Sequence, residues 1–581
     1  MSKETIVRRL RPSLSHRFQC LHQPTQFAHS FSLGPMLCAQ GAPRDVTHDY
    51  EKRITQLDSS IPRLEWYPRL PAVAKISQIQ KNSLEKRYES LQPDETNEEQ
   101  EIAAIGRITS IRTAGSKLVF LDIETSGSVQ AVVQLSHLVK SDPDLDVPRF
   151  KSFAKLARVG DVYMVRGHAH RTARGELSVL ASHLPKLLAP SLHQVPAVLE
   201  DASTRAAQPH VDMLVNPVAV QTLRVRHHVE RTLTDFLDDR GFTKVTTPIL
   251  CASAGGAVAR PFETVATELA HETLQLRIAP ELWLKRLIIG GFKRVYELGP
   301  AFRNEGVDAT HNPEFQICEF YQAYATLGDL MTMTEELLRG MDAAIKKACS
   351  SEKLSAIPAC KVDLTSPKFK RVEFLPALAE KIGHSLPDLD SSTATSDIVA
   401  LFENNSLPIP ASPTLPRLLD ALAGHYLEPA SNESPLFIIH HPACMSPLAK
   451  HFICETTGQT VSARAELFVQ GREFANMYEE ENSPFVQEEK FAQQRALRGE
   501  SAGVAGGDLE AMTGDEGYVR ALEWGLPPTG GWGCGVERLV MLFAGRDRIA
   551  DVLPFGHLRN VVALGTADRL VGKNTKEEVC G

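Results

Sequence analysis

Ionisable and amide side chains are concentrated in one stretch of the sequence, FRNEGVDATHNPEFQICEF at residues 302–320. It contains Arg303, Glu305, His311, Asn312 and Glu314. A hairpin tip is usually polar only because water covers it, but this tip is long and both flanks have the composition of buried strand. The stretch therefore has the side chains of a binding loop, and the flanking elements must position them.

The C-terminal flank of this loop, FQICEFYQAYA, predicts a β-strand whose alternate side chains share one face. The residues on that face are Phe315, Ile317, Glu319, Tyr321 and Ala323. Phe315 to Tyr321 spans roughly 20 Å at about 3.3 Å per residue. Such a face could hold an extended ligand, with an aromatic platform at one end and a carboxylate and a phenol near the other.

A second stretch, FANMYEE, repeats the arrangement, because Asn476, Tyr478 and Glu480 would share one strand face. Each strand taken alone could be an ordinary half-exposed strand. The two strands and the loop together favour a binding site instead.

In GGWGCGVERLVMLF (residues 530–543) spaced glycines precede an amphipathic helix, where a flat or anionic ligand could approach backbone amides. Arg538 falls in the first turn, where a cation opposes the helix dipole; an anion nearby would explain it.

Two regions with different sequence patterns flank these motifs. Residues 106–187 alternate apolar and polar positions between glycine turns, which predicts about five short strands and, most simply, an OB-fold barrel. Residues 106–186 carry twelve Lys and Arg against seven Asp and Glu, which is compatible with contact to nucleic acid.

Downstream, Asn216 as N-cap and Pro217 as first residue predict a long helix that ends near Gly241, followed by a strand that stops at Pro248. Runs of strands with irregularly interspersed helices then indicate an α+β domain, built on a mostly antiparallel sheet flanked by helices.

Composition excludes several classes of protein. The chain has 581 residues, too many for one compact domain, and its 43% apolar and 23% charged residues are ordinary for a globular protein. No stretch approaches 18 consecutive apolar residues, so we expect no membrane partner. The ten cysteines include no Cys-x-x-Cys pair, which argues against a zinc knuckle or redox dithiol and fits a reducing compartment.

Charge is unevenly distributed along the chain. Residues 1–44 hold six Lys and Arg against one Glu, a net +5, which leaves −13 for the rest of a chain whose net charge is −8. An Arg-rich, Ser-bearing segment that is almost free of acids is typical of a mitochondrial transit peptide, although a disordered tail is the alternative. We expect a transit peptide and a location in the mitochondrial matrix.

Three stretches together resemble the signature motifs of class II aminoacyl-tRNA synthetases. The long helix and the strand ending at Pro248 resemble motif 1, FRNEGVDATHNPEFQICEF resembles motif 2, and GWGCGVERLVMLF resembles motif 3. The sequence has no Walker A loop and no class I His-Ile-Gly-His or Lys-Met-Ser-Lys-Ser signature. Within class II, over about residues 100–560, four stretches resemble lysyl-tRNA synthetases of the mitochondrial, fungal kind: AGGAVARPFET (254–264), LRIAPELWLKRLIIGGFKRVYELG (276–299), HPACMSPLAK (441–450) and LPPTGGWGCGVER (526–538).

The resemblance implies activation of L-lysine by ATP to lysyl-adenylate and transfer of lysine to tRNA(Lys). It assigns ATP to Arg303, Glu305, His311, Asn312, Phe315, Glu466, Glu473 and Arg538, with Arg303 and Arg538 catalytic. It assigns lysine to Gly255, Glu281, Glu319, Tyr321, Asn476, Tyr478 and Glu480. Glu480 and Tyr321 would face the ε-ammonium group, Gly255 and Glu281 the α-amino group.

Further expectations come from the same resemblance. Glu466 and Glu473 would ligate Mg²⁺, a hard cation that takes carboxylate and phosphate oxygens. In the barrel, Phe120, Gln130 and Glu176 match positions that read the anticodon, although each is also an ordinary barrel residue. In motif 3, Glu537 replaces the usual Asp, and Trp532 and Cys534 are bulkier than is usual and could reshape the ATP pocket.

The expected domain organisation follows from these assignments. Residues 1–45 are the expected transit peptide, 46–190 a helical lead and the OB-fold anticodon-binding domain, 191–216 a linker, 217–565 the catalytic domain with an insertion near 348–435, and 566–581 a C-terminal tail. We also expect a homodimer, because the family is dimeric through motif 1.

Three rival functions remain. An aspartate- or asparagine-specific ligase should offer a cationic side-chain pocket, whereas this sequence offers carboxylates. A lysyltransferase acting on a protein would lack the anticodon barrel. A non-catalytic tRNA-binding paralogue would have no need to keep Arg303, Glu466, Glu473 and Arg538 together.

Overall fold

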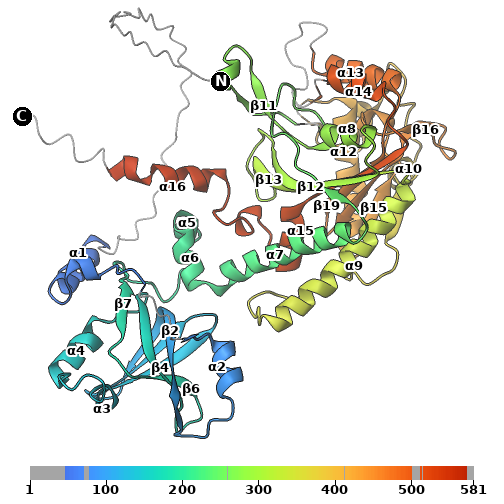
Figure 1. The fold of residues 1–581 in the computed structure, drawn as a ribbon. Coiled ribbons are helices and arrows are strands. Elements are labelled where there is room, and N and C mark those ends of the chain that lie inside the picture. Colours follow the sequence, from blue (N-terminus) through green and yellow to red (C-terminus); the bar gives the residue numbers. More distant parts are fainter. Residues whose placement is uncertain are drawn as a thin grey trace, which may run out of the picture. The chain divides into compact units, whose positions relative to one another are not determined.

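The computed structural model describes residues 46–70, 77–257, 259–410, 412–499, 511–512 and 514–571. It separates into two compact units, Met1–Gln194 and Val195–Gly581, which are described one at a time (Figure 1). The expected transit peptide, residues 1–45, lies outside the described residues, as do residues 572–581 of the expected tail. Within the described residues, no helix combines the length and the apolarity needed to cross a bilayer.

The first unit is a barrel with a few short helices. Its elements are α1 (Val46–Asp58), β1 (Ser77–Gln78), α2 (Lys81–Tyr88), β2 (Thr96–Thr113), β3 (Leu118–Glu124), β4 (Ser128–Gln134), α3 (Leu135–Leu138), α4 (Val147–Leu156), β5 (Val162–Arg171), β6 (Leu177–Ala181) and β7 (Lys186–Ala189). The strand order is β1-β2-β3-β4-β6-β5-β7, and β2 also pairs with β5, which closes the sheet into a barrel. The predicted OB-fold is confirmed.

Two glycines permit close strand approach in this barrel. A Cβ on Gly106 of β2 would lie 1.9 Å from the Glu124 carbonyl oxygen, and one on Gly167 of β5 would lie 2.0 Å from that of Leu180. Alternate side chains such as Leu121 and Val165 fill the interior, as expected for a small closed barrel.

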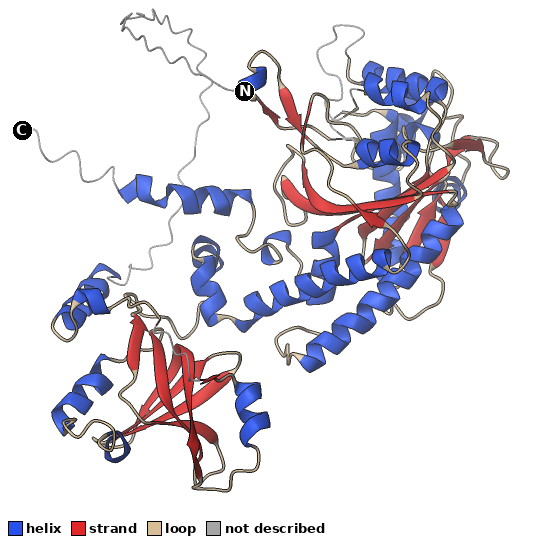
Figure 2. Ribbon diagram, viewed as in Figure 1, coloured by secondary structure: helices blue, strands red, loops and turns tan. Residues whose placement is uncertain are grey.

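The second unit contains a large mixed sheet flanked by helices (Figure 2). Its strands are β8 (Thr243–Lys244), β9 (Leu250–Cys251), β10 (Glu263–Thr264), β11 (Leu274–Leu276), β12 (Arg294–Phe302), β13 (Glu314–Ala323), β14 (Lys370–Glu373), β15 (Leu436–Ile439), β16 (His451–Ile453), β17 (Thr460–Ser462), β18 (Arg464–Val469), β19 (Arg472–Glu479) and β20 (Thr529–Gly535). Its helices are α5 (Ala202–Ala207), α6 (Pro209–Val215), α7 (Pro217–Asp238), α8 (Glu281–Ile289), α9 (Leu327–Ser351), α10 (Phe374–Ile382), α11 (Ala394–Asn404), α12 (Leu415–Tyr426), α13 (Pro484–Leu497), α14 (Glu516–Leu522), α15 (Val536–Ala544) and α16 (Leu558–Val571).

The main sheet of this unit has the strand order β14-β15-β18-β19-β20-β13-β12-β8. The β14–β15 and β12–β8 pairs are parallel and the other pairs are antiparallel. Helices α7, α9 and α15 pack their apolar faces against one side of the sheet, in a core that includes Val229, Leu330 and Val540. The predicted α+β class and the mostly antiparallel sheet are therefore confirmed.

Helix α7 begins at Pro217 with Asn216 in the N-cap position, as predicted, but the Asn216 side chain makes no capping hydrogen bond. The Asn216 side-chain amide donates instead to the Leu199 carbonyl oxygen at 2.9 Å and to Asp212 Oδ1 at 2.6 Å. Contacts to the preceding segment therefore replace the local cap that sequence preference favours. The strand expected to run up to Pro248 is also short, because only Thr243–Lys244 pairs with β12.

Candidate active site and nucleic-acid face

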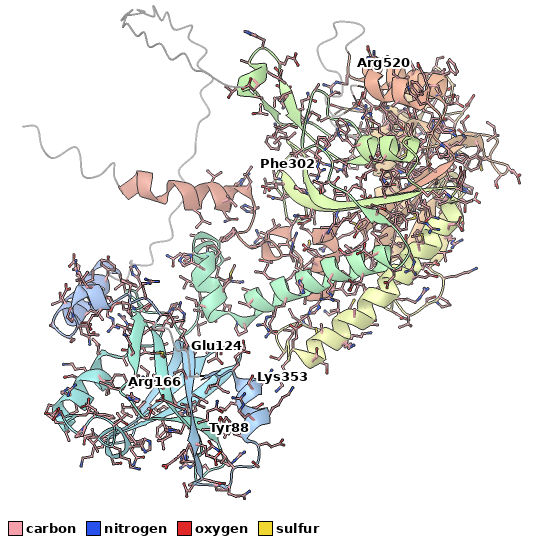
Figure 3. All side chains as sticks on the ribbon, viewed as in Figure 1. Tyr88, Glu124, Arg166, Phe302, Lys353 and Arg520 are labelled. Atoms are coloured by element: carbon pink, nitrogen blue, oxygen red, sulfur yellow. The ribbon has the colours of Figure 1, made fainter. Side chains whose placement is uncertain are left out.

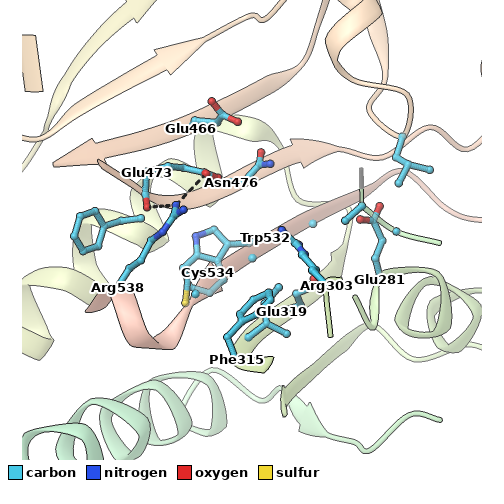
Figure 4. Close-up of a pocket in the computed structure, with 18 of the residues that line it drawn as sticks. Glu281, Arg303, Phe315, Glu319, Glu466, Glu473, Asn476, Trp532, Cys534 and Arg538 are labelled. Carbon is cyan, nitrogen blue, oxygen red and sulfur yellow. Dashed lines mark hydrogen bonds and ion pairs between the residues drawn. The ribbon is translucent and has the colours of Figure 1, made fainter. Parts of the chain in front are cut away.

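A cavity of about 470 Å³ opens above β13, β19 and β20 of the second unit (Figure 4). Thirteen of the residues that the sequence assigns to ATP and lysine line it: Glu281, Arg303, Glu305, His311, Asn312, Phe315, Glu319, Tyr321, Glu466, Glu473, Asn476, Tyr478 and Arg538. Residues distant in sequence are therefore brought to one site. The loop after Phe302, the last residue of β12 (Figure 3), forms part of the rim.

Strand register explains the open floor of the cavity. Glu319 and Tyr321 of β13 lie opposite Gly533 and Gly531 of β20. On the other edge of β20, Asn476 and Tyr478 of β19 lie opposite the same two glycines. A Cβ on Gly531 would lie 2.5 Å from Tyr321 Cε1. The glycines of motif 3 thus leave the middle strand bare between two strands that carry functional groups.

Two arginines bring positive charge to one end of the cavity, where acids also lie. The Arg303 guanidinium lies 5.1 Å from the centre of the Phe315 ring, and its buried Nε has no hydrogen-bond partner among the described residues. Burial lowers the pKa of Arg303, an effect that the acids around it oppose. Arg538 Nη1 donates to the Glu473 carbonyl oxygen at 2.7 Å and contacts Glu473 Oε2 at 3.2 Å. A buried donor without a partner in such a setting suits an anionic ligand.

The motif 2 loop is held by its own side chains. Asp308 accepts hydrogen bonds from the backbone N–H groups of Thr310 at 2.6 Å and His311 at 2.8 Å. Burial raises the pKa of Asp308, but these hydrogen bonds outweigh burial and lower the pKa to about 2. Asn312 Oδ1 accepts from the N–H of Leu558, and Arg538 Nη2 lies 3.3 Å from His311 Nε2. The loop is therefore anchored to motif 3 and to the segment that follows it.

The acidic wall beside Arg538 comes from β18 and β19. Glu466 contacts Arg464 and lies 3.1 Å from His441 Nε2. Burial raises the pKa of Glu466, but Arg464 and His441 outweigh it and hold the pKa at about 2. Arg464 Nε also donates to Asn476 Oδ1 at 3.1 Å. Glu466 is therefore a carboxylate at any ordinary pH, next to the second acid, Glu473.

The opposite end of the cavity gathers carboxylates and phenols. Tyr478 donates to Glu281 Oε1 at 2.7 Å, and Tyr321 donates to Glu319 Oε2 at 3.2 Å. Burial first, and the neighbouring Glu281 second, raise the pKa of Glu319 to about 8. This end is suited to ammonium groups, which carboxylates and aromatic faces both attract.

Two of the residues assigned to lysine are not among those lining the cavity. Gly255 is one residue from the lining Gly256 and packs against α8, where a Cβ would lie 2.6 Å from Leu282 Cδ1. Glu480 lies behind Gly531 and is 1% exposed. Its assigned contact with a ligand remains a prediction.

The structure adds site residues that the sequence reasoning missed. Arg464 lines the cavity, and His441 supports Glu466. Lys285 is fully buried and pairs with both Glu281 and Glu480. Its position four residues after Glu281 was the available signal, because on a helix such as α8 that spacing places two side chains side by side.

The bulky residues of motif 3, Trp532 and Cys534, line the cavity and also belong to the core below the sheet. Trp532 stacks on Phe320 with 5.0 Å between ring centres and donates from Nε1 to Thr334 Oγ1 of α9 at 2.9 Å. Cys534 lies opposite Cys318, a buried residue of the core below the sheet. Strand alternation directs their side chains to the helix side, but both residues are among those that line the cavity. That they reshape the ATP pocket stays a prediction.

Three residues assigned to the anticodon share one face of the barrel. Phe120 and Asp122 alternate on β3, and Asp122 pairs with Gln130 of β4. Gln130 is opposite Ser178 of β6 and accepts its hydroxyl hydrogen at 3.1 Å. Glu176 is exposed, two residues before Ser178 and so on the same side.

Arg112 of β2 extends this face. Its guanidinium lies 5.7 Å from the Phe120 ring centre, and it pairs with Asp122 at 3.1 Å. An aromatic ring with a cation beside it is a surface on which an unpaired base can stack.

Comparison with known proteins gives the same two-part organisation. Residues 201–559 match the family described as tRNA synthetases class II (D, K and N), and residues 102–187 match an OB-fold nucleic acid binding domain. The chain is 41% identical to a mitochondrial lysine–tRNA ligase of Schizosaccharomyces pombe, over 78% of this chain and 84% of that protein. It is 37% identical to a lysine–tRNA ligase of Cladosporium cladosporioides (84% and 81%) and 36% identical to a mitochondrial one of Saccharomyces cerevisiae (78% and 81%). The chain therefore belongs to the class II tRNA synthetases of the D, K and N group, in its lysine–tRNA ligase branch.

Proposed function

We propose that this protein attaches L-lysine to tRNA(Lys) at the expense of ATP, through a lysyl-adenylate, for translation in the mitochondrial matrix. The observation that carries the proposal is the cavity lining, in which Arg303 and Arg538 lie near Glu473 while Glu281 and Glu319 are grouped with the phenols of Tyr478 and Tyr321. A diamino acid whose carboxylate meets ATP beside the arginines would place both ammonium groups at the acidic end. An aspartate side chain would meet like charge there, and an asparagine side chain would bring no positive charge to pair with the carboxylates.

The chemistry needs no protein nucleophile. The lysine carboxylate oxygen attacks the α-phosphorus, and pyrophosphate leaves. The terminal ribose hydroxyl of the tRNA then attacks the lysyl carbonyl carbon, and AMP leaves. Arg303 would neutralise charge on the α-phosphate, and Arg538 would hold the γ-phosphate, so catalysis consists of positioning and charge stabilisation. The ring of Phe315 would support adenine, and Glu305, His311 and Asn312 would contact the nucleotide.

The residues present fit Mg²⁺. Glu466 and Glu473 offer carboxylate oxygens from adjacent strands, and Glu466 stays ionised because of Arg464 and His441. No group of three or more candidate ligand side chains occurs among the described residues, which suits an ion that binds through one or two carboxylates and substrate phosphates. Bound there, Mg²⁺ would offset the charge of the ATP phosphates.

The partners follow from the two units. The face with Phe120, Gln130 and Glu176 would read the anticodon of tRNA(Lys), and we expect a homodimer formed through the motif 1 region. Location in mitochondria is supported by the basic, almost acid-free composition of residues 1–44 and by the mitochondrial relatives at 41% and 36% identity.

Two assays test the proposal. ATP–pyrophosphate exchange measured with each of the twenty amino acids should depend on lysine alone, and aminoacylation should then load lysine onto tRNA(Lys). Exchange with aspartate or asparagine would favour the ligases of the same group. No exchange with any amino acid would favour a tRNA-binding paralogue without catalytic activity.

A further inference from the structure

Lys285 of helix α8 is a buried cation at the acidic end of the cavity. Its Nζ lies 2.5 Å from Glu281 Oε1 and contacts Glu480 Oε2, and its side chain is 0% exposed. The rings of Tyr321, Tyr478 and Tyr518 surround it, with centres 5.9, 5.6 and 5.7 Å from Nζ. A cation so placed needs both carboxylates, because an unpaired buried charge is strongly unfavourable.

The two carboxylates depend on Lys285 in turn. No described residue forms a hydrogen bond with Glu480 Oε1, and Oε2 has Lys285 as its ion-pair partner. Glu281 receives Lys285 and the Tyr478 hydroxyl on the same oxygen, Oε1. Lys285 thus fixes the separation of two acids that come from α8 and from the residue just after β19.

Charge balance extends this argument to the ligand. Glu281, Glu319 and Glu480 can supply three negative charges, and Lys285 supplies one positive charge. A diamino acid brings two ammonium groups, so with all three acids ionised the loaded pocket is neutral only when Lys285 is present. Without it, one of the three buried carboxyls would have to take up a proton, and that carboxyl could then no longer pair with an ammonium group.

We propose that Lys285 is a positioning residue for amino-acid recognition: it holds Glu281 and Glu480 apart and aligned so that each can receive one ammonium group of lysine. The inference rests on the proposed function. It assigns Lys285 no contact with the substrate, since its Nζ is already shared by the two acids.

The ionisable groups around Lys285 come from four elements. They are Glu281 of α8, Glu319 and Tyr321 of β13, Tyr478 and Glu480 at the end of β19, and Tyr518 of α14. Lys490 of α13 repels Lys285, but its own counter-ion is Glu481. Burial alone lowers the pKa of Lys285, but Glu281 and Glu480 raise it above its ordinary value, so the ammonium form persists. Burial raises the pKa of Glu480, and Lys285 is the first group that opposes the rise. Loss of Lys285 therefore raises the pKa of Glu480 further.

The test compares Lys285→Met with Lys490→Met. Lys490 is a matched control because it is also buried, at 5% exposure, and pairs with a carboxylate, Glu481, at 2.8 Å without lining the cavity.

ATP–pyrophosphate exchange is measured from pH 6 to 9.5 over a range of lysine and ATP concentrations. For Lys285→Met we expect the acid limb of kcat/KM for lysine to move up by about one pH unit or more, hence about tenfold or more loss below the limb, with partial recovery at high pH. KM for ATP in Lys285→Met should stay within about threefold of the wild-type value. Lys490→Met should keep the wild-type acid limb of kcat/KM for lysine.

Each outcome has one meaning. Wild-type protein without lysine-dependent exchange would refute the proposed function, independently of Lys285. If wild type is active and Lys285→Met keeps the wild-type acid limb, or loses lysine and ATP kinetics equally at every pH, the positioning role is overturned. If Lys285→Met does not fold, Lys285→Gln, which keeps donors but no charge, provides the same measurement. Failure of both to fold beside a folded Lys490→Met would also overturn the proposal, in favour of a role in folding.

Discussion

Arg226 of helix α7 and Glu537 of helix α15 form a buried ion pair, with 2.9 Å between Arg226 Nη2 and Glu537 Oε1. The same carboxylate accepts a hydrogen bond from the backbone N–H of Gln316 in β13 at 3.0 Å. One side chain therefore connects the regions that resemble motifs 1, 2 and 3. Glu537, a departure from the expected Asp, has a structural role at this junction.

Glu537→Gln should lower the free energy of unfolding by about 3 kcal/mol, because it leaves a partly buried guanidinium short of its counter-charge. Urea denaturation without ligands measures the change. Glu230→Gln is the control, since Glu230 also pairs with Arg226, at 2.8 Å, but is 34% exposed. A pair of that kind contributes about 0.5 kcal/mol or less. Equal losses in the two variants would show that burial does not distinguish the pairs.

Alternation within single strands made part of this site predictable from sequence. It correctly grouped Phe315, Ile317, Glu319 and Tyr321 on one face of β13, because side-chain direction in a strand repeats every two residues. The same rule applied to β20 puts Gly531 and Gly533 on the face between β13 and β19, and Trp532 and Cys534 on the face that packs into the core. The glycines at every second position were the missed signal for the open floor of the cavity.

Contacts that depend on strand order could not be predicted in this way. The meeting of Lys285 with Glu480 requires β19, β20 and β13 to be neighbours and α8 to pack beside them. No local sequence pattern predicts this pairing, because Lys285 and Glu480 are about 195 positions apart in the sequence. Asn216 shows the related limit, in that tertiary partners outcompeted a favourable local cap.

Arg303→Lys should reduce kcat for pyrophosphate exchange by roughly 10²–10³-fold, the usual effect of removing one preorganised donor to a transition-state anion. Lysine keeps the charge but lacks the planar fork that matches phosphate and carboxylate. Arg286→Lys is the matched control, because Arg286 pairs with Asp515 at 3.1 Å and does not line the cavity. A similar loss in both variants would contradict a specific role for Arg303.

Phe120→Ala should affect the charging of tRNA(Lys) but not the activation of lysine by ATP. Loss of one stacked base removes about 1–3 kcal/mol of binding, so charging of tRNA(Lys) should fall roughly tenfold or more. Lysine-dependent pyrophosphate exchange takes place without the anticodon and should not change. Phe120→Tyr keeps the ring and serves as the control. Parallel losses in both assays would identify Phe120 as a residue of the fold.

A chain that starts at Asp45 should keep full aminoacylation in vitro but fail to enter mitochondria. The removed segment carries the net +5 and lies outside the described residues, so neither the barrel nor the cavity loses a described contact. Import into isolated mitochondria and charging of tRNA(Lys) are the two measurements. Continued import, or an inactive truncated chain, would refute the transit-peptide prediction.

Glu319→Gln should stabilise the ligand-free protein more at high pH than at low pH. The pKa of Glu319 is raised from 4.5 to about 8, so the folded protein binds more protons than the unfolded chain between those values. Stability of the ligand-free protein therefore falls as pH rises through this window, since the buried carboxyl must ionise near Glu281. At pH 6 the acid is neutral in the folded protein but ionised in the unfolded chain, so the variant should already have a higher Tm than the wild type. At pH 9 the difference should be larger.

Lysine should reverse that advantage. An ammonium group brought near Glu319 favours the ionised acid, so kcat/KM for lysine in the wild type should rise as pH passes about 8. Glu319→Gln should flatten this limb and gain less thermal stability from added lysine at pH 9. Tm measured at pH 6 and 9, with and without lysine, tests both statements, and Glu336→Gln, a surface acid paired with Arg240, provides the control. A pH-independent Tm difference would mean that Glu319 does not titrate in this range, and the acid limb would then belong to another group.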